Sequence, residues 1–435
     1  MKTSVKTLLL AGALSLPMAS WAQERELTAS EVISYALENH PQLAVSQKKM
    51  EVSRQNTEVA KLQKLPTLTA STSQFYLGNS LIIDKDFSNS MSVALPHYGS
   101  TYAVQASQLI FKGGAVNKSI EITELQQQLA QLDYEKDQQD VKFLVLSNYL
   151  DIYKTMNQNE VYLNNKKLAQ ERLRNTMKFY EQGMITRNEV IRSELAIKNI
   201  DQGLIVLANN RKILNYNLNK ALGFADDIQI IPVEPVHAAL ELRDLAYYQQ
   251  LAHSSNPREK SLRTSVAVAE KNIEIIKTEQ MPTIGAFGGY SLNRPMTSTQ
   301  PVLDMYSGGF QVGVSVNYNI DNLFKTKEKI QLGTLQKEQT EETYRLAAQG
   351  IDMEVNAAYT RYQNAQQNLI LVEEAKELAN ENYKIIEAKY LNQLAVQAEM
   401  TDAQNQKIQA ELDYANAEIE AMYQYYNLLK TTGTL

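Results

Sequence analysis

The chain has 435 residues, no Cys, 43 Lys and Arg against 49 Asp and Glu, and a formal net charge of −6 at pH 7. A mildly acidic chain without a long Lys/Arg block argues against nucleic-acid binding, and the lack of Cys excludes disulfides and an N-terminal lipid carried on Cys. No segment after residue 22 holds 18 consecutive apolar residues, so we expect no transmembrane helix.

Residues 1–22 have the pattern of a secretory signal peptide. Lys2 and Lys6 supply the positive start, Leu8–Leu16 the short apolar run, and Ser20-Trp21-Ala22 a small-x-small cleavage site. Removal of the two Lys residues changes the net charge from −6 to −6 − 2 = −8. We therefore expect an exported protein that is not a lipoprotein.

The distribution of Pro indicates a duplication. Residues 97–231 and 302–435 form two Pro-free blocks of nearly equal length, and Pro is strongly disfavoured inside helices. The motifs "NHPQL…KLPTL" and "SNPRE…QMPTI" precede these blocks, and "KFYEQGMITRNEV" (178–190) matches "AKYLNQLAVQAEM" (388–400) at an offset of 388 − 178 = 210. Ordered pairs at consistent spacing predict two repeats, 23–231 and 232–435.

The same elements are predicted in both repeats. A helix of about 24 residues comes first (Leu43–Leu65; Glu259–Met281), followed by two strands, a helix of nearly 70 residues, a turn and a helix of about 35. The strands are expected at about 66–77 and 100–111, then 282–293 and 309–320, and the helical hairpins at about 114–223 and 323–432.

The strands are too few and the helices too long for an ordinary soluble domain. In "GFQVGVSVNYNID", apolar residues from Phe310 to Ile320 alternate with polar ones, which suits a tilted membrane-spanning strand. An ordinary soluble sheet is the alternative interpretation. Two hairpins are too small to be stable alone, and four strands cannot close a barrel, so several chains would have to share one. A helix of about 70 residues reaches roughly 100 Å.

The chain begins with a signal peptide and then repeats one series of elements twice: a helix, two strands, a long helix, a turn and a shorter helix. This order resembles the TolC family of outer-membrane efflux and secretion factors. The motifs "SQLIFKGG", "YEQGMITRNEV" and "NLNKALG" strengthen the resemblance. It implies a mainly α fold with a small β part. It also implies a homotrimer in which each chain gives four strands to a twelve-stranded barrel in outer-membrane lipid and its helices to a periplasmic tunnel. The implied partners are a periplasmic adaptor (membrane fusion protein) and an inner-membrane transporter.

The resemblance also assigns functional residues at the periplasmic tip. Gly183 matches the family's tip Gly, Glu189 an acidic gate position, Tyr390 a Tyr that bonds across to that position, and Glu399 and Asp402 two acids that ring the constriction.

The tip residues expected to contact the adaptor are Gln182, Gly183, Met184, Gln393 and Leu394. Two positions depart from the family pattern: Gln393 stands where the second tip usually has Gly, and Ala395 where the best-known member has an Arg that bonds across the closed entrance.

Other chemistry finds little support in the sequence. Four separated His and no Cys predict no metal site, no cofactor is expected, and no hydrolase triad stands out. Gly113 and Gly114 fit a strand-to-helix junction better than a phosphate loop, because the GK[ST] ending is missing. We therefore predict a non-enzymatic outer-membrane exit duct. The alternative is a soluble periplasmic coiled-coil scaffold or chaperone, which would leave the alternation at 310–320 unexplained.

Overall fold

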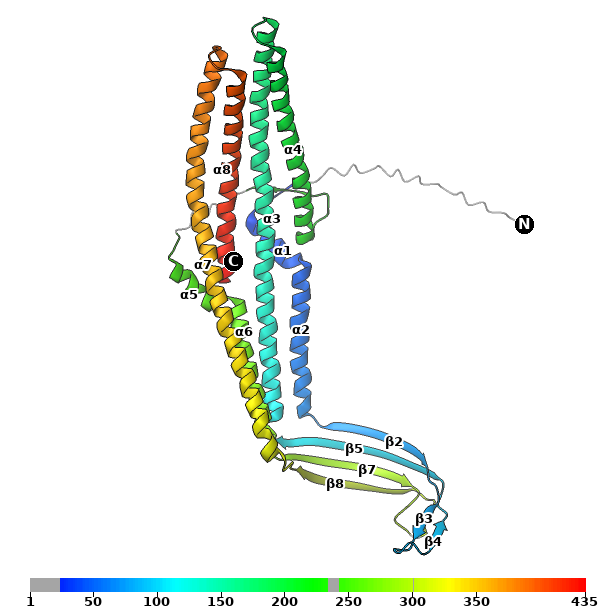
Figure 1. The fold of residues 1–435 in the computed structure, drawn as a ribbon. Coiled ribbons are helices and arrows are strands. Elements are labelled where there is room, and N and C mark those ends of the chain that lie inside the picture. Colours follow the sequence, from blue (N-terminus) through cyan, green and yellow to red (C-terminus); the bar gives the residue numbers. More distant parts are fainter. Residues whose placement is uncertain (1–23, 234–241, 300) are drawn as a thin grey trace, which may run out of the picture.

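The computed structural model describes residues 24–233, 242–299 and 301–435, so the predicted signal peptide lies outside the described residues. Figure 1 shows an elongated molecule in which the α3/α4 and α7/α8 hairpins end side by side, far from the sheet at the opposite end, which has four strands. The predicted fold class, mainly α with a small β part and a duplicated plan, is confirmed. Within the described ranges, no helix is both long and apolar enough to cross a membrane.

The two repeats contain corresponding elements. The first repeat consists of β1 (Glu24–Leu27), α1 (Ala29–Asn39), α2 (Pro41–Lys61), a 3₁₀ turn η1 (Leu62–Lys64), β2 (Thr67–Tyr76), β3 (Ser80–Ile83), β4 (Ser90–Val93), β5 (Tyr98–Lys112), α3 (Ala115–Glu181) and α4 (Arg187–Leu222). The second consists of β6 (Gln229–Pro232), α5 (Leu245–Ser255), α6 (Pro257–Thr278), β7 (Thr283–Arg294), β8 (Ser307–Asn317), α7 (Asn322–Leu391) and α8 (Gln397–Thr432).

Helix boundaries follow local sequence signals. Pro41 and Pro257 occupy the first turns of α2 and α6, where a missing N–H costs nothing. The residue before each Pro caps the helix: His40 Nδ1 accepts from a backbone N–H at 3.2 Å, and the Asn256 amide oxygen does so at 2.9 Å. Both hairpins then end at a Gly in the left-handed conformation, one residue beyond α4 and α8.

The sheet joins the two repeats. Its order is β2-β5-β7-β8 and every pairing is antiparallel, so the central β5–β7 contact pairs one strand from each repeat. On the edge strand β8, Phe310, Val312, Val314 and Val316 point to one face and are 82, 81, 66 and 64% exposed. The strand ends at Asn317, and a turn at residues 320–321 leads into α7, so Tyr318 and Ile320 lie beyond the ladder.

Several short elements were not predicted. The helices α1 and α5, the parallel pair β1–β6 and the hairpin β3–β4 all lie outside the repeated motifs. The short helices α1 and α5 lie near mid-length of the long helices (Figure 1), and β1 and β6 contribute Leu27 and Ile230 to a buried cluster with α1, α3 and α4. Their burial anchors the hairpins: Tyr149 of α3 is fully buried and its hydroxyl donates to the Leu27 carbonyl at 3.0 Å.

Candidate functional site: the two helical tips

The first tip is a compact helix-ending turn. Gly183 has φ of +73°, and its N–H donates to the Tyr180 carbonyl at 2.9 Å. The Met184 N–H donates to the Phe179 carbonyl at 2.9 Å. These two bonds form a Schellman motif, which satisfies the last carbonyls of α3 and needs a left-handed residue at the position that Gly183 occupies.

The second tip forms the same motif without Gly. Gln393 has φ of +64°, its N–H donates to the Tyr390 carbonyl at 3.0 Å, and the Leu394 N–H donates to the Lys389 carbonyl at 2.8 Å. A left-handed backbone with a side chain costs roughly 1–2 kcal/mol. Replacement of the family's usual Gly by Gln393 therefore leaves the turn unchanged but places a side chain in a strained backbone conformation.

The helices that leave the tips start differently. Thr186 precedes α4 and its side chain makes no capping bond, although Glu189 lies three residues later. Val396 has no side-chain acceptor, yet its N–H donates to the Glu399 carboxylate at 3.1 Å. Glu399 thus caps α8, while Glu189, in the same position of the other repeat, makes no side-chain hydrogen bond within the described chain.

The two tips touch each other at their ends. The side-chain amide of Gln393 lies 3.9 Å from the sulfur of Met184. All five residues predicted to contact an adaptor are exposed: Gln182, Gly183, Met184, Gln393 and Leu394. In Figure 1 the turn between α3 and α4 and the turn between α7 and α8 stand at the same end of the molecule.

In the single chain Tyr390 contacts Thr176 rather than Glu189. Its ring is buried, and its hydroxyl lies 3.2 Å from the Thr176 hydroxyl of α3. The bond to Glu189 that the resemblance implies is not formed in the described single chain. Thr176 lies near the end of α3, on the same side of the tip as Tyr390 at the end of α7, whereas Glu189 lies past the turn in the first turn of α4.

The two remaining acidic residues are exposed near the second tip. Asp402 accepts a hydrogen bond from Gln406 one turn later at 2.8 Å, and Glu399 holds the start of the same helix. Carboxylates three residues apart share one helix face and can attract cations together. The structure thus brings Glu399 and Asp402 to one helix face and leaves Glu189 on another hairpin.

Sequence reasoning missed the polar residues that lie buried between the hairpins. They include Arg172, Thr176, Ser193, Gln397 and Gln404. One signal was present in the sequence: Gln158, Asn165 and Arg172 recur every seven residues on the long helix, at the spacing that usually carries apolar residues in a helix–helix seam.

At the opposite end of α3, Gly113 and Gly114 form the strand-to-helix junction, with φ of +57° and +82°. A Cβ on Gly113 would lie 3.0 Å from Met281 and from Thr278. Any larger residue at Gly113 would therefore combine backbone strain with a clash against the junction of the second repeat.

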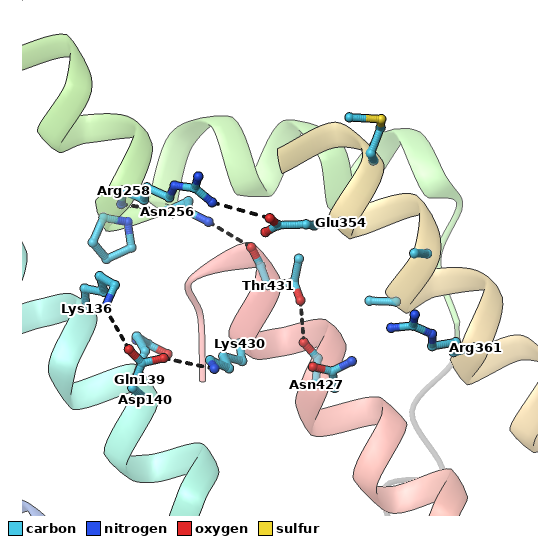
Figure 2. A pocket seen from close by; sticks show the side chains of 14 residues that line it. Lys136, Gln139, Asp140, Asn256, Arg258, Glu354, Arg361, Asn427, Lys430 and Thr431 are labelled. Atoms are coloured by element: carbon cyan, nitrogen blue, oxygen red, sulfur yellow. Dashed lines mark hydrogen bonds and ion pairs between the residues drawn. The ribbon is translucent and has the colours of Figure 1, made fainter. Parts of the chain in front are cut away.

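A polar pocket of about 530 Å³ lies where the repeats meet, lined by residues of α3, α6, α7 and α8. Figure 2 shows Lys136 and Lys430 converging on Asp140, with N–O distances of 2.9 Å each, and Asn256 donating to the Thr431 carbonyl. Burial alone would raise the pKa of Asp140, but hydrogen bonds from the two Lys residues hold it below its ordinary value. The residues around the pocket thus connect the two repeats by ion pairs and hydrogen bonds.

The described His residues make structural contacts. His40 caps α2, His97 bonds the Leu77 carbonyl at 2.8 Å, and His253 lies 2.8 Å from Glu259, while His237 is outside the described residues. Among the residues that the structure describes, no group of three or more His, Cys, Asp or Glu has the geometry to hold a metal ion.

Two long helical hairpins that meet at their tips, joined to a four-stranded sheet at the far end, define the class of elongated outer-membrane channel subunits. The chain belongs to the outer membrane efflux protein family, whose model matches residues 32–224 and 248–434. No functionally curated protein sequence matches the chain significantly.

Solved structures share this fold. The CmeC outer membrane channel of Campylobacter jejuni has a TM-score of 0.73 at 13% identity, covering 93% of this chain and 85% of that one. VceC of Vibrio cholerae gives 0.75 at 13%, covering 93% and 96%. The open state of the MtrE channel of Neisseria gonorrhoeae gives 0.71 at 16%, covering 93% and 88%.

Proposed function

We propose that this chain is one of three identical subunits of an outer-membrane exit duct, which carries small molecules or proteins across the periplasm and the outer membrane. The observation that carries the proposal is the order of elements across the molecule. The sheet runs β2-β5-β7-β8, the helices beside it α2-α3-α6-α7, and the helices of the tip α4-α3-α8-α7. All three rows end on the same two edges, one formed by β2, α2 and α4 and the other by β8 and α7.

Different surfaces at the two edges favour head-to-tail association. A contact between unlike edges generates a closed ring when the rotation between copies closes. Each copy would then contribute four strands to one shared barrel and its helices to one hollow tunnel, and three copies would supply the twelve strands that the family resemblance implies.

Both edges carry uncovered apolar ridges at seven-residue spacing. On α2 the ridge is Val45, Val52 and Val59, which are 52, 61 and 53% exposed. On α7 it includes Leu371, Leu378 and Ile385, which are also exposed. A repeat of seven is typical of helices that pack along their length against another helix. A second copy of the chain would cover both ridges.

The apolar face of β8 supports a place in lipid. Phe310 and Val312 are the most exposed members of a row that no element in the described part of the chain covers. A strand of 9–11 residues, tilted, spans a bilayer. The alternative function, a soluble periplasmic scaffold, would leave this row in water, so we favour the outer membrane with the helices extending into the periplasm.

The exposed tips fit contact with other proteins. Met184 and Leu394 are apolar and exposed at the far end from the sheet, where a periplasmic adaptor would engage them and an inner-membrane transporter would supply cargo through it. The duct itself catalyses no reaction in this proposal. Glu399 and Asp402, repeated by symmetry, would form an acidic ring near the closed entrance, with Glu189 and Tyr390 beside it.

Fractionation and electrical recording test the proposal. The full-length protein should be recovered in the outer membrane as a detergent-resistant trimer, and the purified trimer should give discrete conductance steps in a planar lipid bilayer. Recovery in the soluble periplasmic fraction, without conductance from the purified oligomer, would instead support the scaffold function.

A further inference from the structure

The contact between the two hairpins near the tip is polar at its centre. Besides Thr176–Tyr390 and the contact at the tips, four polar side-chain pairs cross it: Gln158–Asn416 at 2.6 Å, Asn165–Glu411 at 2.7 Å, Arg172–Gln404, and Ser193–Gln397 at 3.1 Å. We call these eight residues the polar seam. Three of its members on α3 are seven residues apart, so they occupy positions where a stable helix–helix seam has apolar side chains.

Arg172 is the poorly compensated member of the polar seam. Its side chain is only 6% exposed, and one nitrogen donates to the Gln404 amide oxygen. The Nε and Nη1 atoms are buried and have no hydrogen-bond partner in the described part of the chain, where no carboxylate lies within ion-pair distance of the guanidinium. A buried charge with a single neutral partner is unfavourable compared with the same charge in water.

The neighbours of Arg172 do not neutralise it. Glu387, the nearby carboxylate, accepts a hydrogen bond from the Tyr383 hydroxyl at 3.0 Å, and the Tyr390 hydroxyl is engaged with Thr176. Burial accordingly lowers the pKa of Arg172, with Tyr383, Tyr390 and Glu387 acting weakly against it. A guanidinium keeps its proton in proteins, so Arg172 stays charged and its burial without a charged partner costs free energy. A neighbouring subunit cannot supply the missing partner, because the chain that carries Arg172 already covers this side chain.

Apolar contacts oppose this cost. Leu150 of α3 packs with Ile419 and Met422 of α8 in a buried cluster between the hairpins, farther from the tip than the polar seam. The closed contact therefore combines an apolar cluster, which holds the hairpins together, with a guanidinium that gains hydration when they separate.

We propose that Arg172 weakens the closed contact between the α3/α4 and α7/α8 hairpins, so that the tip separates with little added energy. This inference rests on the proposed function, because a tip that opens has a use only in a duct. It predicts that an apolar residue of similar length, as in Arg172→Met, stabilises the closed contact between the hairpins. If Arg172 instead held the hairpins together, the same substitution would destabilise that contact.

Disulfide trapping measures tip closure directly, since the chain has no Cys of its own. In the variant Met184→Cys/Gln393→Cys, the two thiols lie across the contact between the tips. Under a mild oxidant, addition of Arg172→Met should raise the disulfide-forming rate about tenfold, as expected when a buried unpaired charge is replaced by an apolar group. Arg172→Lys keeps the charge and should leave the rate within about twofold of the parent.

A second cysteine pair controls for general effects on folding and reactivity. Lys166→Cys/Asp201→Cys replaces an ion pair of 2.7 Å that joins α3 to α4 inside one hairpin, so its rate should be the same in every Arg172 background. Arg172→Gln, neutral and able to bond Gln404, serves if the Met variant fails to assemble, and it should also raise the rate at the tip.

The outcomes separate this inference from the proposed function. A slower or unchanged tip disulfide in both neutral variants overturns the role of Arg172. Absence of conductance from the native trimer overturns the duct, whatever the trapping shows. If neither proposal is overturned, the Arg172→Met trimer should open about tenfold less often than the native trimer in bilayer recordings. More frequent opening would show that Arg172 stabilises the closed contact instead.

Discussion

The hydroxyls of Tyr390 and Thr176 lie 3.2 Å apart across the two hairpins, and both side chains are buried. The bond joins the last turn of α7 to α3, just before both helices reach their tips. It places Tyr390 in the contact within one chain, where the family resemblance had paired it with Glu189.

The pairing of Tyr390 with Thr176 predicts a coupled loss of tip stability. The Thr176 hydroxyl also donates to the Arg172 carbonyl at 3.0 Å, so Tyr390 is the donor in their bond. Tyr390→Phe and Thr176→Val should each cost about 1 kcal/mol, because each removes this bond across the hairpins. The double variant should cost little more than either single variant. Hydrogen exchange of the amides in the last turns of α3 and α7 measures the local opening free energy.

Glu189→Gln provides the comparison. If Tyr390 and Glu189 are independent, their effects on exchange and on leak through the trimer should add. Clear non-additivity between them would show that the pair implied by the resemblance forms in the assembled trimer.

The strained turn at Gln393 predicts a stabilising substitution. Gln393→Gly should strengthen the end of α7 by about 1 kcal/mol, since Gly adopts positive φ without a steric penalty. Exchange of the Leu394 amide should slow about fivefold. Gly183→Gln is the reciprocal change and should speed exchange of the Met184 amide by a similar factor; no difference between the two turns would show that the strain is relieved elsewhere.

The exposed acids near the second tip predict sensitivity to multivalent cations. Asp402→Asn combined with Glu399→Gln removes the charges while Gln at 399 can still accept from the Val396 N–H. Block of single-channel current by multivalent cations should weaken, because fewer carboxylates converge on the entrance. Asp413→Asn is a matched control, since Asp413 also accepts from a Gln one turn away, at 2.8 Å, but lies farther from the tip. Equal block in all variants would place the acids away from the pore.

The valine ridge of α2 predicts a site of subunit association. Val52 is 61% exposed in the single chain, and Val52→Glu would place a charge in the proposed contact with the neighbouring copy. The trimer should lose resistance to detergent and heat, as measured by gel mobility and light scattering. Gln47→Glu adds the same charge on the side of α2 that faces α3 and α6, where a pocket of about 850 Å³ leaves room, and should leave the trimer intact.

A His between two carboxylates predicts a mild dependence of stability on pH. His253 hydrogen-bonds Glu259, and its other ring nitrogen lies 3.1 Å from Asp352, so its pKa is raised above the ordinary 6.5. A raised pKa stabilises the fold fully below about 6.5, and this contribution is lost as pH rises through the higher folded value.

Thermal unfolding from pH 5 to 9 measures this effect. Because the side chain of His253 is 39% exposed, the contribution should stay below about 1 kcal/mol after solvent screening. His253→Gln should flatten the pH dependence above 6.5. His97→Gln, which replaces a ring that bonds a backbone carbonyl, should leave it unchanged, and an unaltered profile in His253→Gln would assign the dependence to other groups.

Local patterns in the sequence were enough to predict the plan of the fold. The paired Pro residues, the repeated turn motifs and the alternation in β8 depend on backbone geometry and on side-chain period, which neighbouring residues set. The short elements near mid-length were missed because α1, α5 and the four-residue strands are stabilised by burial against the long helices, as Tyr149 and Leu27 show.

In the long helices, the spacing of apolar residues does not predict which of them are buried within one chain. Ile351, Val355, Ala358 and Tyr362 recur at three- and four-residue spacing along α7 and are buried in the chain. Leu378 has the same spacing but is 68% exposed, because it lies on the edge of the row of helices. Periodicity identifies an apolar helix face, but the neighbour that covers it depends on tertiary and quaternary arrangement.

The sequence by itself determined the duplicated plan, the elongated helices and the positions of both tips, because caps, Pro, Gly and periodicity act over a few residues. Only the tertiary structure decided the partners at the tip: Tyr390 with Thr176, Arg172 with Gln404, and Gln393 in a left-handed turn beside Met184. These contacts join residues more than 200 positions apart, and no local rule specifies which faces of two long helices meet.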